Sequence, residues 1–429
     1  MEDKFDAIVV GAGPAGCAAA YTLAKEGLEV LLVERGKFAG AKNVSGGVLF
    51  GPILNNLFPN FWEDAPIERH VSRHVLTVLS EKTSFSIDFR SSRFNEPPYN
   101  GFTVLRAKFD PWFAKKAEQA GAILATGLQA DELLQDNQQV VGIVAGGDDL
   151  LADIVIAADG VNSLMAQKAG LARKFSPKHV NQGVKEVIEL PRETIEERFN
   201  LIGDSGAAME FMGFSIKGVH GGGFLYTNKE SISLGVVAQL HSLIEHNVKG
   251  SELLEIFKSH PQIIPLIKDG TTVEYSAHLV PAAGLRMLPQ LYGDGILVAG
   301  DAAALTLSTG IYLEGINFAI ASGIAAAETV IKAKGKGDFS KKTLSNYEEL
   351  LKESFVLKDL NNTQRASRFL DNRRLYRTYP DLACGLAERV FRVDGSPKKK
   401  LWKLLREEMK GKVSIWQIIR DAISLGRAI

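Results

Sequence analysis

Apolar runs followed by glycine turns recur at three distant places along the chain. Each begins as a β-like apolar run and ends in a helix-like stretch of small residues. The first covers residues 5–25 and is followed by a further apolar run, LEVLLVER; the others cover residues 152–170 and 293–333. Parallel strands that alternate with helices predict a doubly wound sheet.

Between the second and third of these segments, the pattern changes to a two-residue alternation. Residues 184–187, the glycine-rich GVHGGGFLYTN and the stretch SISLGVVAQL read as antiparallel strands. We expect them to form a second sheet that is inserted into the first lobe. Residues 332–343, KAKGKGDFSKKT, read as a solvated linker.

The first glycine turn, GAGPAG, has the spacing of a dinucleotide-binding turn. Gly11 allows a sharp exit from the strand, Gly13 lets the backbone approach a pyrophosphate, and Gly16 lets the helix pack closely on the sheet. Pro14 and Ala15 open a helix whose unpaired amides face the diphosphate. Because strand, turn, helix and second strand occur in order, we expect a bound dinucleotide.

An acidic residue ends the second strand. Glu34 stands eighteen residues after Gly16, where a carboxylate accepts hydrogen bonds from an adenosine ribose, and we assign its neighbour Arg35 to the same site. Cys17 lies on the helix among alanines and is expected to pack there.

Two later segments favour FAD over NAD. Asp159 and Gly160, in the sequence ADG, and Asp301, in VAGDAA, follow predicted strands as in FAD enzymes of the para-hydroxybenzoate hydroxylase type. The resemblance implies that Asp301 binds the ribityl hydroxyls. Arg106, just before a predicted helix, suits the pyrophosphate or the ribityl chain, and Ala130 is included among the cofactor-binding positions.

The third segment also supplies groups for the flavin ring. Gly310 and Gly315 allow a close approach to the isoalloxazine, and a helix from about Gly315 and Ile316 points its amides at the ring. Those amides stabilise the charge of the reduced, anionic flavin.

The small-residue loop GAKNVSGG, residues 40–47, is expected to lie against the ring. We place four of its residues beside the flavin: Asn43, Ser45, Gly46 and Gly47. Ser45 is either a hydrogen-bond donor to the flavin or a turn-forming serine.

Composition limits the remaining classes of function. The 50 basic and 50 acidic residues cancel, which argues against a global nucleic-acid binder. Two cysteines are too few for a disulfide framework or for an iron–sulfur cluster, and we predict no metal site. We find no signal peptide and no run of about 20 apolar residues, so we expect a soluble protein or one attached to a membrane from one side.

At this point the sequence resembles the electron transfer flavoprotein–quinone oxidoreductases, specifically the bacterial FixC or EtfC type, which is related to the geranylgeranyl reductases. Beyond the FAD motifs, the resemblance is carried by GAKNVSGG, by GVKEVIELP at 183–191, by GGGFLYTN at 221–228 and by FLDNRRLYRTYP at 369–380. It implies a flavoprotein that passes two electrons, with protons, to a membrane quinone at the cytoplasmic face of the cell membrane.

The resemblance also implies partners. Family members with a fused iron–sulfur domain carry additional C-terminal cysteines that this chain lacks. It therefore implies a separate ferredoxin-like iron–sulfur subunit and a two-subunit electron transfer flavoprotein that oxidises NADH, with flavin-based electron bifurcation as one mode. Two other readings stay open: a reductase or hydroxylase that acts on a lipid or small molecule, and a non-catalytic electron relay.

The resulting architecture is α/β, with a Rossmann-like FAD-binding domain, an inserted antiparallel sheet and a helical C-terminal region. We expect the FAD domain to comprise residues 1–75, 101–175 and 275–345, and the quinone domain to comprise residues 76–100 and 176–274. Within EYSAHLVP, Tyr275 and His278 are either a proton relay to the quinone or ordinary buried polar groups. The glycines of GGGF, 221–224, either admit the quinone head group or serve a hairpin.

The C-terminal region, residues 346–429, is basic at its end. Residues 364–429 hold 16 basic and 7 acidic residues, net +9, so the preceding 363 residues carry −9. The last stretch places Ile415, Ile419 and Ile423 on one helical face with Trp416 near its edge. Such a helix could lie on an anionic membrane, dock the iron–sulfur partner or pack on its own domain.

Overall fold

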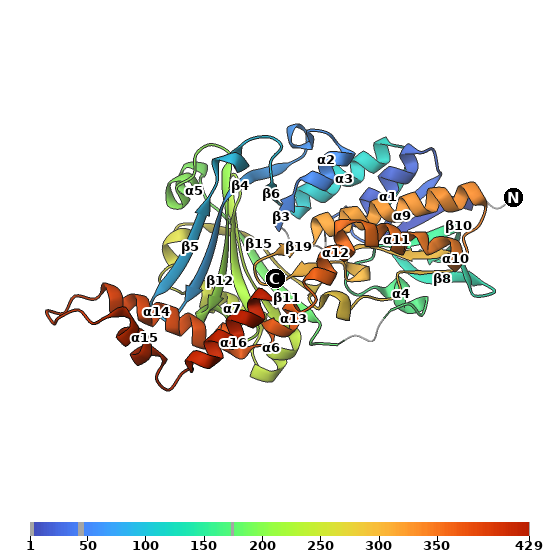
Figure 1. Cartoon of the computed structure of the whole chain (residues 1–429). Coiled ribbons are helices and arrows are strands. Elements are labelled where there is room, and N and C mark those ends of the chain that lie inside the picture. Colours follow the sequence, from blue (N-terminus) through green and yellow to red (C-terminus); the bar gives the residue numbers. More distant parts are fainter. Residues whose placement is uncertain (1–3, 42–46, 173–175, 429) are drawn as a thin grey trace. The chain divides into compact units, whose positions relative to one another are not determined.

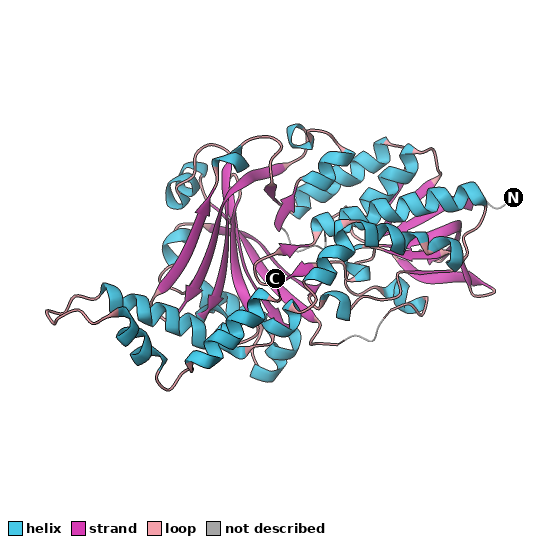
Figure 2. Cartoon of the chain, viewed as in Figure 1, coloured by secondary structure: helices cyan, strands magenta, loops and turns pink. Residues whose placement is uncertain are grey.

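The computed structural model describes residues 4–41, 47–172 and 176–428 and divides into two compact units. Unit 1 comprises residues 1–67, 104–179 and 280–364, and unit 2 comprises residues 68–103, 180–279 and 365–429. Both units are therefore built from separate stretches of chain, which Figure 1 colours by sequence and Figure 2 by secondary structure.

Unit 1 contains the predicted doubly wound sheet. Its strand order is β16-β17-β10-β1-β2-β7, and β1 pairs in parallel with both β2 and β10. An antiparallel extension runs from β10 through β9 to β8. The strands are β1 (Lys4–Val10), β2 (Val30–Glu34), β7 (Ile123–Thr126), β8 (Ala130–Asp136), β9 (Gln139–Ala145), β10 (Asp148–Ala157), β16 (Tyr292–Gly293) and β17 (Ile296–Val298).

The sheet of unit 1 is packed against helices, two of which, α1 (Pro14–Lys25) and α9 (Ile316–Lys336), are rich in small residues. The third main helix is α3 (Arg106–Gln119). A Cβ on Gly323 of α9 would lie 2.1 Å from the Ala15 carbonyl oxygen of α1, so these helices approach more closely than larger residues permit. The other helices are α2 (Pro52–Leu57), α4 (Leu164–Lys168), α10 (Lys341–Leu344), α11 (Asn346–Glu353) and α12 (Phe355–Asn362).

Helix α9 bears on two expectations. It is long and apolar enough to span a membrane, although the sequence pattern indicated no such stretch, and 72% of its most apolar window is buried inside the protein. It also continues to Lys336, into the predicted linker, because Gly337 with φ of 64° provides the left-handed residue that ends it.

Unit 2 is built on a second sheet in the order β15-β11-β14-β13-β12-β4-β6, with β5 paired to β4. The predicted antiparallel strands are β11, β13 and β14, but β12 and β4 pair in parallel, so the sheet is mixed. The strands are β4 (Ile67–Leu79), β5 (Ser84–Arg90), β6 (Gly101–Val104), β11 (Val180–Glu189), β12 (Ser205–Gly213), β13 (Gly221–Thr227), β14 (Ser231–Gln239) and β15 (Thr271–Pro281).

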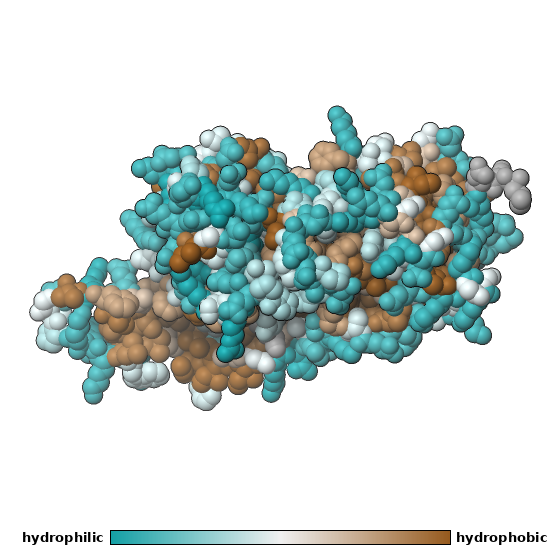
Figure 3. Space-filling model, turned by 90° about the horizontal axis from the view of Figure 1, so that it is seen from above, coloured by the Kyte–Doolittle hydropathy of each residue, from teal (hydrophilic) through white to brown (hydrophobic). Residues whose placement is uncertain are grey.

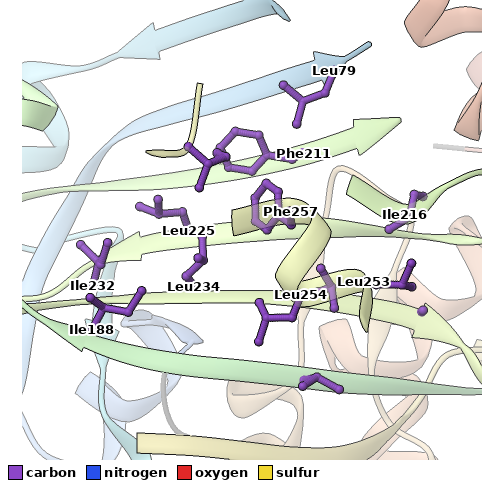
Figure 4. Packing of buried hydrophobic residues seen from close by; sticks show 14 of the residues in the cluster. Leu79, Ile188, Phe211, Ile216, Leu225, Ile232, Leu234, Leu253, Leu254 and Phe257 are labelled. Carbon is purple, nitrogen blue, oxygen red and sulfur yellow. The ribbon is translucent and has the colours of Figure 1, made fainter. Parts of the chain in front are cut away.

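One face of this second sheet forms the core of unit 2. Figure 4 shows side chains of the strands, such as Phe211 and Leu225, pointing toward Leu254 and Phe257 of α7 (Gly250–Lys258). A Cβ on Gly223 would lie 2.9 Å from the Phe257 ring, so this glycine of GGGF makes room for the core. The nearby helices are α5 (Arg192–Phe199), α6 (Leu240–His246) and α8 (Ile264–Ile267).

The C-terminal helices are divided between the units. We expected one region from residue 346, whereas residues 346–364 pack with unit 1 and residues 365–429 pack with unit 2. Those of unit 2 are α13 (Ala366–Leu370), the 3₁₀ turn η6 (Arg373–Tyr376), α14 (Thr378–Phe391), α15 (Leu401–Met409) and α16 (Ile415–Gly426).

Helix α16 is attached through its polar side. Asp421, with a 10% exposed side chain, accepts hydrogen bonds from Arg374 (2.7 and 2.9 Å), Tyr379 (2.6 Å) and Asn372 (2.8 Å). Burial alone disfavours its charge, but these donors outweigh that effect and lower the pKa of Asp421. The apolar side of α16 points outward, with Trp416 76% exposed.

Candidate functional site

The three glycines of the first turn have different surroundings. Gly11 has φ of 106°, and a Cβ there would lie 2.4 Å from the Ala158 carbonyl oxygen. A Cβ on Gly16 would lie 1.9 Å from the Gly11 carbonyl oxygen. Gly13 is different, since its Cβ would meet nothing described closer than Arg106 Nη2 at 4.0 Å. Gly11 and Gly16 are thus needed by the fold, whereas Gly13 leaves open space.

That space lies at the start of α1. Gly13 is its N-cap residue and Pro14 opens the helix, so the amides of Ala15 and Gly16 belong to the first turn, which has no intrahelical acceptors. Together with the helix dipole, such amides favour a negatively charged group. The turn therefore fits a phosphate-bearing ligand.

Glu34 ends β2 beside this turn. Its carboxylate accepts hydrogen bonds from the amides of Ala12 (3.1 Å) and Gly36 (2.6 Å), which fix its orientation and leave further lone pairs for a ribose. The neighbouring Arg35 is exposed. Ala130 begins β8, two residues beyond Leu128, whose amide donates to the Glu34 carbonyl at 3.0 Å.

Asp159 follows β10, and one of its two carboxyl oxygens accepts a hydrogen bond from the following segment. Its Oδ2 accepts the Met165 amide at 3.0 Å, while Oδ1 is buried and accepts no hydrogen bond from any described residue. Burial raises the pKa of this carboxyl. A buried acceptor of this kind is rare in proteins, and here it lies next to Gly11, whose Cβ would be 3.3 Å from the Asp159 Cα.

Arg106 is the first residue of α3 and is held by a residue that sequence reasoning missed. The fully buried Asp110, one helical turn later, accepts two hydrogen bonds from it, at 2.6 and 2.7 Å. Burial opposes the charge of Arg106, but Asp110 outweighs it and raises the pKa of the guanidinium. The spacing of four residues in a helix was the available signal.

Asp301 lies near this pair, in the 3₁₀ turn η5 (Gly300–Ala303). Burial raises the pKa of Asp301, whereas the charge of Arg106 lowers it. The preceding Gly300 has φ of 63°, and a Cβ there would lie 2.8 Å from the Ala15 Cβ at the start of α1. The structure thus brings together Asp301, Arg106 and the first glycine turn, although they are far apart in sequence.

The start of α9 lies beside β3 (Gly47–Phe50). Gly315 is the N-cap residue, Ile316 opens the helix, and a Cβ on Gly47 would lie 3.9 Å from Ile316 Cδ1. Asn317 was not foreseen: its amide group donates to Glu314 at 2.5 Å, while its Oδ1 is buried and unpaired among the described residues.

The remaining predicted positions are less informative. Asn43, Ser45 and Gly46 lie outside the described residues. Gly160 and Gly310 have φ of 80° and 88°, so both need the left-handed conformation that glycine adopts readily.

The structure does not bring the side chains of Tyr275 and His278 together. They are three residues apart on β15, so their side chains leave opposite faces of the strand, and Tyr275 is 54% exposed. Cys17 is buried and its thiol contacts the Ala12 carbonyl at 3.3 Å, and burial raises the thiol pKa well above its usual value. An unreactive packing residue has these properties.

Comparisons with known proteins place these features in a family. Residues 6–195 match the model described as FAD dependent oxidoreductase, and residues 366–429 match the ETF-QO/FixC family C-terminal domain. Protein FixC of Escherichia coli is 47% identical over 98% of each chain, and the probable electron transfer flavoprotein-quinone oxidoreductase YdiS of the same organism is 42% identical over 100% of each chain.

Solved structures share the fold. A geranylgeranyl bacteriochlorophyll reductase-like protein of Thermoplasma acidophilum superposes with a TM-score of 0.74 at 22% identity, over 99% of each chain. The flavin-dependent brominase Bmp2 superposes with a TM-score of 0.68 at 16% identity, over 98% of each chain. At these identities the likeness establishes the architecture alone.

Fold, glycine turns and family model together define an FAD-dependent oxidoreductase. FAD is its cofactor, and it supplies the electron transfer chemistry. With relatives at 47% identity over nearly the whole chain, the chain belongs to the FixC family, which is similar to electron transfer flavoprotein–quinone oxidoreductases.

Proposed function

We propose that this chain passes electrons from a reduced electron transfer flavoprotein to a quinone at a membrane surface, through its own FAD. Three features support it: family membership, the buried unpaired acceptors of unit 1, and the outward apolar side of α16. The apolar side of α16 supports the proposed membrane location of the acceptor, because a water-soluble acceptor requires no exposed apolar helix.

In unit 1, each group of the site binds a different part of FAD. The Gly13 turn receives the diphosphate of FAD, Arg106 neutralises it, and Asp301 accepts from the ribityl hydroxyls. Asp110 is the positioning residue that holds Arg106. The amides at the start of α9, from Gly315, would hold the flavin ring and would stabilise negative charge on it.

The surface of α16 supports a membrane-bound acceptor. A groove of about 560 Å³ is lined by apolar residues, including Trp416 and Ile423, and by four arginines, Arg365, Arg368, Arg420 and Arg427. Figure 3 shows apolar side chains gathered on the part of unit 2 where α14 and α15 lie in Figure 1. Apolar residues beside basic ones suit the interface of an anionic bilayer.

The partners follow from the same proposal. With only two cysteines, both buried and free, this chain cannot hold an iron–sulfur cluster by itself. We therefore assign the cluster to a separate ferredoxin-like subunit, and the entry of electrons to a two-subunit electron transfer flavoprotein. Electron bifurcation, if these partners perform it, requires their flavins as well.

A choice of acceptors tests the proposal. The FAD-loaded protein is photoreduced without oxygen and is then mixed with a ubiquinone analogue, a menaquinone analogue or a geranylgeranyl lipid. We expect the flavin absorbance to return with a quinone and to stay bleached with the lipid. Reoxidation by the lipid with none by quinones would establish a reductase of lipid double bonds, and reoxidation by oxygen alone would exclude the proposed reaction.

A further inference from the structure

The groove of about 560 Å³ beside α16 lies wholly within unit 2. Two of its arginines, Arg365 and Arg368, come from α13 and its N-cap residue, and the other two, Arg420 and Arg427, come from α16 and its C-cap residue. The described lining contains no lysine and no acidic residue. This arginine groove therefore presents four guanidinium groups with no carboxylate in its lining to compensate them.

The arginines of the groove have few partners in the protein. The side chains of Arg365, Arg368 and Arg427 make no hydrogen bond or ion pair with any described residue. Arg420 Nε is 3.8 Å from Asp421 Oδ1, but this carboxylate is already hydrogen-bonded on the inner side of α16. Four like charges around one groove repel each other, so their arrangement favours the binding of an anion.

One side of α16 places apolar side chains between these charges. Trp416, Arg420, Ile423 and Arg427 follow one another at intervals of four, three and four residues, so they share one side of the helix. Trp416 is 76% exposed and Ile423 is 52% exposed. At 1.5 Å per residue, this side extends about 16 Å from Trp416 to Arg427. A ligand that covers it has an anionic part and an apolar part.

Both helices of the groove are attached to unit 2 by contacts on their other sides. Asp421, on the opposite side of α16 from Trp416, accepts the hydrogen bonds described above. The Leu370 carbonyl at the end of α13 accepts a hydrogen bond of 2.6 Å from the hydroxyl of Tyr376, a residue of the unit 2 core. The two helices also contact each other. The arginine groove is therefore formed before a ligand binds, which reduces the entropy lost on binding.

The use of arginine at all four positions indicates the kind of anion. A guanidinium group presents a planar fork of N–H donors that matches the oxygens of a phosphate, whereas the ammonium group of lysine acts as a point charge. Elsewhere in the same region lysines predominate, as in residues 398–400. A carboxylate also fits the fork, but the apolar side chains between the arginines favour alkyl chains beside the anion. An anionic phospholipid supplies a phosphate and alkyl chains in one molecule.

We propose that the arginine groove binds one anionic phospholipid, whose phosphate is held by the arginines and whose acyl chains lie against Trp416 and Ile423. This inference rests on the membrane attachment in the proposed function and deepens it, because it replaces a diffuse attraction to a bilayer by a discrete lipid site. A discrete site binds single lipid molecules in solution as well, which a surface that is merely basic does not.

The first test uses lipids that do not form a bilayer. The FAD-loaded protein is titrated in a calorimeter with dihexanoyl phosphatidylglycerol below its critical micelle concentration, with dihexanoyl phosphatidylcholine and with inorganic phosphate. We expect saturable binding of one phosphatidylglycerol per chain. The choline group is repelled by the arginines and inorganic phosphate has no acyl chains, so both should bind at least about tenfold more weakly. Inorganic phosphate that binds as tightly as the lipid would assign the groove to free phosphate and, like the absence of saturable lipid binding, would overturn the proposal.

Charge-conserving variants separate recognition by guanidinium groups from simple attraction. The double variant Arg420→Lys, Arg427→Lys keeps both charges and should bind the phosphatidylglycerol at least about fivefold more weakly, because the forked donors are lost. The control is Arg377→Lys, Arg392→Lys, which changes two exposed arginines of unit 2 outside the groove and should bind as the wild type does. Equal affinity in the two double variants would mean that the groove is only a basic surface.

A bromine-labelled form of the same lipid locates the acyl chains. Bromine quenches tryptophan fluorescence only at close range, so the lipid should quench part of the emission of the wild type. The quenching should be lost in Trp416→Phe, which keeps an apolar ring in the groove, and kept in Trp402→Phe, whose tryptophan is 56% exposed on α15. Quenching that survives in Trp416→Phe and is lost in Trp402→Phe would place the lipid outside the arginine groove and refute the proposal.

Failure of the lipid site and failure of the proposed function give different results. If no lipid binds in the groove and the photoreduced protein still reduces quinone analogues, the lipid site is wrong and the proposed electron transfer stands. If the lipid binds as expected and no quinone analogue is reduced, the proposed electron transfer is wrong and the lipid site stands on its own titrations.

Discussion

Gly13 and Gly16 occupy the same turn, but a methyl group added to each would meet different surroundings. At Gly16 it would clash with the Gly11 carbonyl oxygen at 1.9 Å, whereas at Gly13 it would enter space that we assign to the diphosphate. Packing and binding can therefore be separated with two alanine variants.

Gly13→Ala should fold normally and bind FAD at least about tenfold more weakly, a loss of roughly 1.4 kcal/mol. Gly16→Ala should unfold more easily in its FAD-free form, by about 1–3 kcal/mol, since overpacking strains the strand and helix. Flavin titrations and denaturant unfolding of the FAD-free proteins measure both effects. If Gly13→Ala binds FAD with unchanged affinity, the diphosphate does not bind at this turn.

Glu210, a partly buried residue of β12 in unit 2, makes stability depend on pH. Its pKa rises from 4.5 in the unfolded chain to about 7 in the folded protein, so the folded state binds more protons between these values. Below pH 4.5 the ionisation of Glu210 therefore does not affect the free energy of unfolding. Between pH 4.5 and about 7 it lowers this free energy as the pH rises.

Glu210→Gln, which stays neutral, should be more stable than the wild type at pH 8, by up to about 3 kcal/mol. The difference should shrink as the pH falls from 7 toward 5. Denaturant midpoints at each pH measure this difference, with Glu189→Gln, a variant of an exposed carboxylate on β11, as the reference. An equal gain at pH 5 and pH 8 would mean that the carboxyl group is not the cause.

Some residues of the site could be found from sequence and others could not. The glycines, Glu34, Asp159 and Asp301 follow apolar runs at fixed spacing, so local pattern was sufficient to select them. Outside the site, the burial of Glu210 gave no such signal, because it depends on the pairing of β12 with β4 and β13. The buried Arg69 is similar: it donates to the carbonyl groups of Asn228 and Gly203, more than a hundred residues away.

At the scale of elements, α16 packs with its polar side inward and its apolar side outward. Helical periodicity predicted its apolar face, which by itself suits core packing. The structure buries Asp421 instead, because Arg374 and Tyr379 from the preceding segments offer it charged and polar partners. The sequence thus predicted the apolar face of α16 correctly. Whether that face points inward or outward depends on the tertiary contacts of Asp421.

This orientation predicts binding to vesicles. The FAD-loaded protein should sediment with phosphatidylglycerol vesicles, less so at high salt, and poorly with neutral phosphatidylcholine vesicles. The double variant Trp416→Glu, Ile423→Glu should bind about 100-fold more weakly, since about 3 kcal/mol of apolar burial is lost.

Ile202→Glu is the matched control for that experiment. Ile202 is 87% exposed in unit 2 and lies outside the C-terminal helices, so this variant adds a carboxylate without changing α16. It should bind vesicles as the wild type does. Equal binding by the double variant would show that α16 is not the membrane contact.

At the scale of the whole molecule, the alternation of strands and helices predicted unit 1, and the two-residue alternation predicted three strands of unit 2. The long strand β4 was missed, because its residues 67–79 mix buried Glu68 and Arg69 with apolar positions. The C-terminal residues joined two different units for a similar reason: which unit a helix packs on is decided by surfaces distant in sequence.

The central claim is that electrons stored on FAD in this chain go to a quinone. Counting the quinol formed per flavin, in one turnover of the photoreduced protein without oxygen, tests it most directly. The account predicts one quinol for each FAD, with the flavin fully reoxidised. Flavin that stays reduced beside excess ubiquinone and menaquinone analogues, and is reoxidised only when air is admitted, would contradict it.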